Sequence, residues 1–302
     1  MKGVYARIVA GAALGRLRRR PDDLPDDERT LEGVEIDREH LTAYDRVCGF
    51  RLRDQLPATY PHVLAFPLAI DLMAGSSFPF SPLGLVHIAN RIEQLRPVDA
   101  GERLDVRVRA ADLGQHDRGT QFDMVAEATT GGEVVWRGRS TYLHRERNVR
   151  SADRRDDSPT GPTTAVWTVA RDTGRRYARV SGDANPIHLH PLTARAFGQP
   201  GAIAHGMWTK ARCLAALEGS LPDAYAVDVR FKLPLRIPGK VAFTSGDGAF
   251  AVHDASNGKP HLTGTYAASA PAGSTAAAGR STVTASAIAA STRLAATANA
   301  RW

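Results

Sequence analysis

Cysteine is scarce in this chain of 302 residues, which contains only Cys48 and Cys213. Two cysteines exclude a disulfide scaffold and a cysteine-rich metal site, and they favour a reducing compartment. Long apolar runs are missing too: no window holds 18 uninterrupted apolar residues, which excludes a membrane-spanning helix. The 43% hydrophobic content instead predicts a globular protein of one large or two medium domains.

Lysine is rare as well, with 5 lysines against 34 arginines in a chain of net charge +7. The densest basic run, at residues 16–20, is followed at once by five acidic residues, so the charge does not predict a nucleic-acid partner. A diffuse positive field suits anionic ligands such as coenzyme A or an acidic carrier protein, although ordinary solvated surface charge is the simpler interpretation. Glycine-rich phosphate loops of the G-x-x-x-x-G-K-[ST] or G-x-G-x-x-G type do not occur.

The composition predicts five segments. Residues 1–30 form an N-terminal extension. Arg7 interrupts the apolar part of this extension, and the strongest positive charges come after the apolar part, whereas a secretory signal has them before it. The sequence therefore favours cytoplasmic residence. Two domains, 31–145 and 165–269, flank a charged and then Pro/Gly/Thr-rich linker at 146–164. Residues 270–302, with 13 alanines and no acid, are predicted to be a disordered tail.

The two domains are related by an internal repeat. YDRVCGF at 44–50 matches YARVSGD at 177–183 with a shift of 133 positions, whereas VLAFPL at 63–68 matches AIAHGM at 202–207 with a shift of 139. Six residues are therefore inserted in the second copy, after Asp183.

Each half repeats one order of elements. A short helix ends at Gly49 or Gly182, a longer apolar helix follows at 64–74 or 207–217, and strands with period-2 alternation come after it, as at 227–231. A central helix followed by an antiparallel sheet is an α+β pattern, and a curved sheet wrapped around a helix is the hot-dog architecture. The chain is therefore predicted to be a double hot-dog, a pseudo-dimer whose sheets join edge to edge and protect their edges.

The segment between the two helices of the second half concentrates the chemistry. Asp183 and His188 lie five residues apart, and Pro186 forces Asn185 into an extended turn, so a carboxylate and an imidazole can converge on one small molecule such as water. Gly206 opens the following helix, where unpaired amide groups and a bare backbone form a natural oxyanion hole.

These residues resemble a known family. S-G-D-A-N-P-I-H at 181–188 and A-H-G-M at 204–207 resemble the signature of MaoC-like (R)-specific enoyl-CoA hydratases and (3R)-hydroxyacyl-thioester dehydratases, and the repeat resembles their two-hot-dog members. The resemblance implies Asp183 and His188 as the catalytic dyad, Asn185 as the residue that orients the loop, and Gly206 as the oxyanion-hole donor. It implies reversible hydration of trans-2-enoyl thioesters, carried by coenzyme A or an acyl carrier protein, in fatty-acid metabolism.

The first half departs from this pattern. Phe50 stands in place of Asp183, Pro67 stands in place of Gly206, and no histidine corresponds to His188. We therefore expect one active site per chain and a degenerate first half, where Phe50, Phe66 and Leu68 leave room for an acyl chain or simply pack in the core.

Alternatives remain open at this stage. A catalytically silent acyl-thioester-binding subunit, or less readily a thioesterase, would use the same fold. His188, His190 and His205 form a weak candidate zinc site, but we expect no metal or redox cofactor because the thioester itself acidifies C2. The phosphates of coenzyme A have three candidate partners, Arg230, Lys232 and Arg236. The simpler interpretation is that these residues are ordinary solvent-exposed charges on and beside a strand. A homodimer of pseudo-dimers is one option for assembly.

Overall fold

The computed structural model describes residues 21–146 and 161–269. The predicted N-terminal helix or extension before residue 21, most of the linker and the predicted disordered tail lie outside these residues. In the described part of the chain, no helix has the length and apolar composition needed to cross a membrane.

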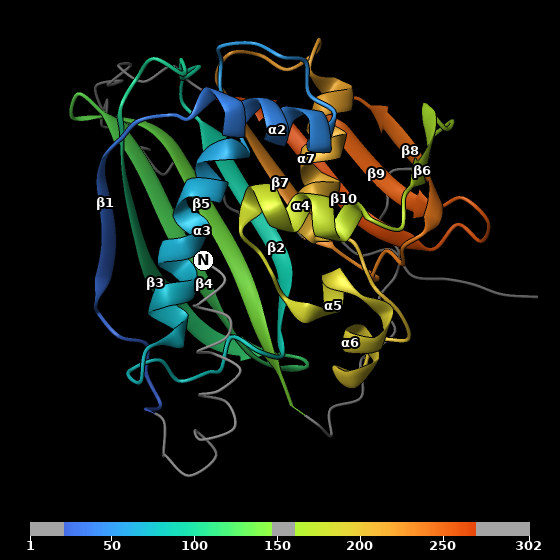
Figure 1. Ribbon diagram of the computed structural model, residues 1–302, viewed down its shortest axis with the longest axis horizontal. Coiled ribbons are helices and arrows are strands. Elements are labelled where there is room, and N and C mark those ends of the chain that lie inside the picture. Colours follow the sequence, from blue (N-terminus) through green and yellow to red (C-terminus); the bar gives the residue numbers. More distant parts are fainter. Residues whose placement is uncertain (1–20, 147–160, 270–302) are drawn as a thin grey trace, which may run out of the picture. The chain divides into compact units, whose positions relative to one another are not determined.

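One antiparallel sheet connects the two halves (Figure 1). Its order among the described residues is β1-β3-β4-β5-β2-β7-β10-β9-β8-β6. The first half supplies β1 (Glu28–Val34), β2 (Leu85–Gln94), β3 (Leu104–His116), β4 (Gly119–Thr130) and β5 (Glu133–Arg145). The second supplies β6 (Ala165–Val169), β7 (Tyr225–Phe231), β8 (Gly239–Gly246), β9 (Ala249–Asp254) and β10 (Pro260–Ala268). The halves meet where β2 pairs with β7, so the predicted edge-to-edge joining is confirmed.

The helices repeat in the same order. The short helices α2 (Arg38–Cys48) and α4 (Thr173–Ser181) both end, as predicted, at glycines in the left-handed region, Gly49 and Gly182, with φ of 84° and 73°. The longer helices are α3 (Tyr60–Ala74) and α7 (Gly206–Leu217), and they lie against one face of the sheet in Figure 1. This arrangement confirms the α+β double hot-dog.

Three features differ from expectation. The sequence predicted no strand at β1 or β6; β1 is exposed at most positions, so its side chains lack the alternation that marks a half-buried strand. The extension predicted to end at residue 30 runs into β1, and the domain boundaries otherwise remain a prediction. The segment with the six-residue insertion folds into two short helices, α5 (Pro186–Leu189) and α6 (Pro191–Ala196), rather than an open loop.

A buried lysine holds the junction of the two halves. Lys210 on α7 has no exposed surface, and its Nζ donates to the Asn90 side-chain oxygen at 2.6 Å and to the backbone carbonyls of Asn90 and Val227 at 3.2 Å each. Asn90 lies on β2 and Val227 on β7. Burial lowers the pKa of Lys210 well below its ordinary value. One side chain therefore ties the central helix to both strands of the seam.

We expect Lys210→Met to destabilise the protein by about 1–3 kcal/mol, because methionine fills a similar volume but cannot donate, so the buried Asn90 side-chain oxygen loses its donor and two carbonyls each lose a hydrogen bond. Urea unfolding measures the difference. Lys240→Met, which changes an exposed lysine on β8, is the matched control and should leave the unfolding midpoint unchanged. A Lys210→Met variant as stable as the unmodified protein would contradict this account.

Candidate active site

Asp183 lies directly after the glycine that ends α4. Its backbone N–H donates to Ser181 Oγ at 3.2 Å, and its Oδ1 accepts from the Asn185 N–H at 3.1 Å. The Asn185 side chain in turn caps α5 by accepting from the Ile187 N–H at 3.4 Å. Asn185 therefore connects the Asp183 carboxylate to the short helix that carries His188.

His188 is buried and its tautomer is fixed by a backbone group. Its Nδ1 lies 2.8 Å from the Ile203 carbonyl oxygen, so Nδ1 carries the proton and donates it, and Nε2 keeps a lone pair. Burial lowers the pKa of His188, an effect that Asp183 and the Ile203 hydrogen bond partly oppose. The imidazole is therefore neutral at pH 7 and able to accept a proton at Nε2.

His205, which the sequence offered only as part of a weak candidate zinc site, lies beside the predicted dyad. Its ring stacks on that of His188 with centroids 3.7 Å apart, and its Nε2 donates to the Asp183 carbonyl oxygen at 3.0 Å and lies 3.8 Å from Asp183 Oδ2. Burial lowers its pKa to about 3, and its Nδ1 has no hydrogen-bond partner among the described residues. The available signal was the A-H-G-M motif itself, in which only the glycine received a role.

Asp183, His188 and His205 also have the residue types of a metal site, with one ligand atom from each within 4.8 Å of the others. His188 Nδ1 and His205 Nε2 each donate to a backbone carbonyl, which leaves His188 Nε2 and His205 Nδ1 as the available ring nitrogens. His190, the third histidine of the candidate zinc site, instead caps α6 by accepting from the Leu192 N–H. The cluster fits proton transfer without any change in these hydrogen bonds.

Gly206 is the first residue of α7, so its N–H belongs to the first turn, whose amides have no partner inside the helix. A Cβ atom added to Gly206 would lie 2.8 Å from the ring of Phe231 on β7, closer than carbon atoms approach without displacement. Glycine at this position therefore allows the helix to begin against β7, with its amide end toward the site.

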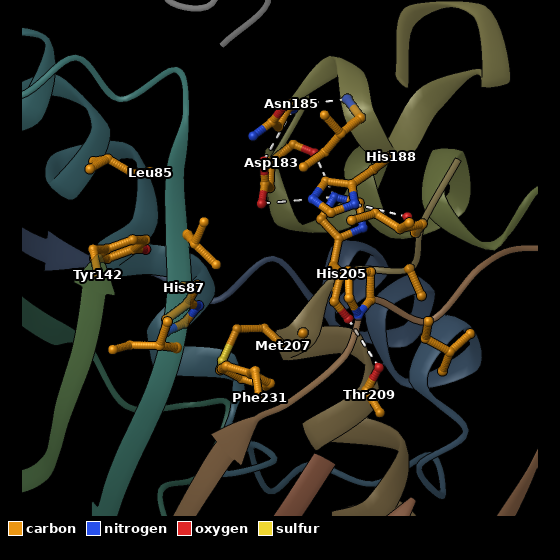
Figure 2. Close-up of a pocket in the computed structure, with 18 of the residues that line it drawn as sticks. Leu85, His87, Tyr142, Asp183, Asn185, His188, His205, Met207, Thr209 and Phe231 are labelled. Atoms are coloured by element: carbon orange, nitrogen blue, oxygen red, sulfur yellow. Dashed lines mark hydrogen bonds and ion pairs between the residues drawn. The ribbon is translucent and has the colours of Figure 1, made fainter. Parts of the chain in front are cut away.

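A cavity of about 310 Å³ contains all these groups. Asp183, Asn185, His188, His205 and Gly206 line it, and Figure 2 shows the three labelled side chains of Asp183, His188 and His205 gathered on one side of the space. The exposed lining residues mark its mouth: Val86, Arg145, Leu233 and Pro234. The two halves of the chain both contribute, so the site lies at their junction.

The first-half wall of this cavity is mainly apolar, with Val63, Phe66, Ile70, Met73 and Leu85 among the lining residues. Of the three apolar residues singled out from the sequence, only Phe66 lines the cavity. Phe50 stacks on Tyr44 instead, with ring centroids 6.3 Å apart, and Phe50 and Leu68 both pack against the core. Of the three candidate phosphate-binding residues, only Lys232 lines the cavity.

Buried histidines around the cavity predict a pH-dependent stability. Burial lowers the pKa of His205 and His87 to about 3 and that of His62 to about 4, against about 6.5 in an unfolded chain. Below pH 6.5 the unfolded state binds protons that the folded state does not. The contribution of these histidines to the free energy of unfolding is therefore complete above pH 6.5 and is lost as the pH drops toward 3.

Urea unfolding of the unmodified protein and of a His87→Phe variant between pH 7 and pH 5 isolates this contribution, because the buried Asp45 carboxyl, whose pKa burial raises to about 7, has the opposite slope but is common to both proteins. A His87→Phe variant should lose part of the slope, because one of the three groups is gone. A His87→Phe variant whose profile runs parallel to that of the unmodified protein would contradict the burial of the His87 ring in neutral form.

Comparison with known proteins identifies the family. A family model described as MaoC like domain matches residues 153–249. The 3-hydroxyacyl-thioester dehydratase X of Mycobacterium tuberculosis is 39% identical over 254 residues, which cover 82% of this chain and 91% of that protein. The crystal structure of HtdX from M. tuberculosis superposes with a TM-score of 0.72 and 37% identity over 80% of this chain and all of that one. A MaoC-like dehydratase from Phytophthora capsici shares the fold, with a TM-score of 0.65 and 20% identity over 82% of this chain and 98% of that one. This chain therefore belongs to the MaoC-like dehydratase family.

Proposed function

We propose that the protein is a hydro-lyase that interconverts trans-2-enoyl and (3R)-3-hydroxyacyl thioesters in fatty-acid metabolism. The observation that carries this proposal is the meeting of the Asp183 carboxylate, the neutral His188 ring and the first-turn amide of Gly206 in one cavity. The relative from M. tuberculosis, named a 3-hydroxyacyl-thioester dehydratase, supports the same reaction.

In the hydration direction, the thioester carbonyl accepts a hydrogen bond from Gly206 N–H, which draws electrons from the C2=C3 double bond. Asp183 and the Nε2 lone pair of His188 hold the water molecule. As the water oxygen bonds to C3, Asp183 takes its proton and the π electrons move onto the thioester oxygen as an enolate. The enolate then takes that proton at C2, so one molecule of water has been added and Asp183 is a carboxylate again. Dehydration is the reverse.

The thioester carrier enters at the basic mouth of the cavity. Arg118, Arg145 and Lys232 all line the cavity, and their charges suit the phosphates of coenzyme A or of the phosphopantetheine arm of an acyl carrier protein. The acyl chain lies against the apolar residues of α3 in the first half. One active site operates per chain, since the first half lacks counterparts of Asp183, His188 and Gly206. We place the reaction in the cytoplasm, where Cys48 and Cys213, both buried and unpaired, suit the reducing conditions.

The direct test adds the purified protein to trans-2-enoyl-CoA substrates of several chain lengths and follows loss of the conjugated thioester absorbance. Chiral analysis of the product should give the (3R)-alcohol. Absorbance that stays constant for every chain length, together with measurable acyl-CoA binding, would overturn the enzyme assignment and favour the silent acyl-binding subunit.

A further inference from the structure

The proposed mechanism leaves unused a group of hydrogen-bonding side chains on the first-half wall of the cavity. His62 on α3, His87 on β2 and Tyr142 on β5 all line the cavity. His87 and Tyr142 are direct cross-strand partners, and their rings stack at 4.7 Å between centroids. The His62 ring lies 6.4 Å from that of His87. Figure 2 shows His87 and Tyr142 across the space from Asp183 and His205.

These side chains can exchange hydrogen bonds with a neutral ligand. Burial lowers the pKa of His62 to about 4 and of His87 to about 3, so both rings are neutral and each has one donor and one acceptor nitrogen. Burial raises the pKa of Tyr142, so its hydroxyl keeps its proton. The group therefore offers donors and acceptors but no charge.

Part of the hydrogen-bonding capacity of these side chains is not used within the protein. His87 Nε2 is buried and has no hydrogen-bond partner among the described residues. The Tyr142 ring packs against His87 and Phe122, so the Tyr142 hydroxyl is held beside this unpaired nitrogen on the cavity wall. Buried polar atoms are rarely left unpaired, because losing water without gaining a partner is unfavourable.

The surroundings indicate which part of a thioester reaches this group. His62 and Tyr142, with Phe66, also border a second, smaller cavity, whose other walls include Val108, Met124 and Ala126 from the core strands of the first half. The exposed lining residues of the main cavity are Val86 and Arg145 in the first half and Leu233 and Pro234 in the second. The shared border with the smaller cavity places the group on a path from the main cavity into the apolar core, where the acyl chain extends.

We propose that His62, His87 and Tyr142 form a subsite for an uncharged oxygen, a hydroxyl or a ketone, on the acyl chain beyond C3. The preferred substrates are then oxygenated acyl thioesters rather than plain hydrocarbon chains. This inference rests on the proposed function. A site built to hydrogen-bond a substrate group discriminates strongly against the analogue that lacks it, because its own polar atoms are then left unpaired.

The test compares kcat/KM for hydration of trans-2-octenoyl-CoA with that of analogues that carry one ketone at C5, C6 or C7, or a hydroxyl at C8. We expect one position to be preferred over the plain chain by about tenfold or more, the ratio given by a single well-formed hydrogen bond. In Tyr142→Phe and His87→Phe, which remove the polar atoms and keep the rings, this ratio should fall toward one. Phe66→Leu, which changes the shape of the same wall without changing its hydrogen bonding, is the control and should keep the ratio.

The outcomes separate the two proposals. If no substrate is hydrated, the proposed function itself fails. If trans-2-octenoyl-CoA is hydrated and no oxygenated analogue is preferred, the subsite is overturned and the function stands. If Tyr142→Phe and His87→Phe slow all substrates by the same factor and the preference persists, the polar group serves the pantetheine arm or a water molecule, and the assignment to the acyl chain is overturned.

Discussion

Asp183→Asn and His188→Asn should each lower the rate of enoyl-thioester hydration by about 100- to 10,000-fold, the usual contribution of a positioned acid–base group. Asparagine at 183 keeps the shape and the oxygen that accepts from Asn185 N–H, but it cannot take a proton from water. Asparagine at 188 places an amide where Nδ1 now lies, so the hydrogen bond to the Ile203 carbonyl can persist while the Nε2 lone pair is lost.

His190 provides a matched control for the second substitution. It is exposed, lies two residues from His188, and its side chain caps α6. Asparagine is itself a good N-cap residue, so His190→Asn should retain both stability and rate. Unfolding midpoints for all three variants exclude a loss of fold. A His188→Asn protein that turns over substrate at the rate of His190→Asn would remove His188 from the mechanism.

Gly206→Ala should lower the hydration rate by about 100- to 1,000-fold, the loss seen when one oxyanion-hole donor is removed. The added methyl group would lie 2.8 Å from the Phe231 ring, so the start of α7 or the ring must move and the Gly206 amide is displaced from the thioester oxygen. The steady-state rate with trans-2-enoyl-CoA measures the effect.

Two further variants identify the cause. Gly219→Ala, just after the same helix, adds a methyl group with no atom within 4 Å and should have no effect. Gly206→Ala combined with Phe231→Leu relieves the contact and should recover part of the rate. If the single variant is fully active, the amide of Gly206 does not position the thioester oxygen. If the double variant recovers nothing while folding normally, contact with Phe231 is not how the alanine acts.

Much of the fold was predictable because its signals are local. Gly49 and Gly182 both end helices in the left-handed conformation, and the repeat fixed the order of elements in each half. The edge strands β1 and β6 were not predicted for different reasons. β1 is exposed at most positions, whereas β6 alternates in burial but its five residues, AVWTV, place the apolar Val166 on the exposed side, so the sequence shows no polar alternation. The helices α5 and α6 were not predicted because they are short and begin with prolines, which also occur in turns.

The candidate site was predictable only where one stretch of chain carries it. Asp183, Asn185, His188 and Gly206 all lie within 24 residues of one another, in two motifs. His62, His87 and Tyr142 reach the same cavity through helix packing and strand register, which no local pattern encodes. The burial of Lys210 has no local signal in the sequence, because it depends on contacts with Asn90 and Val227, which belong to different halves.

The covalent fusion of two hot-dog units has an evolutionary consequence. In a dimer of identical single units, any substitution appears twice, so a change that suits the acyl chain in one copy also alters the catalytic loop of the other. When the two copies belong to one polypeptide and pair through β2 and β7, their sequences can diverge independently. The first, which has Phe50 and Pro67 where the second has Asp183 and Gly206, is then free to shape the cavity wall through residues such as Phe66 without altering the second.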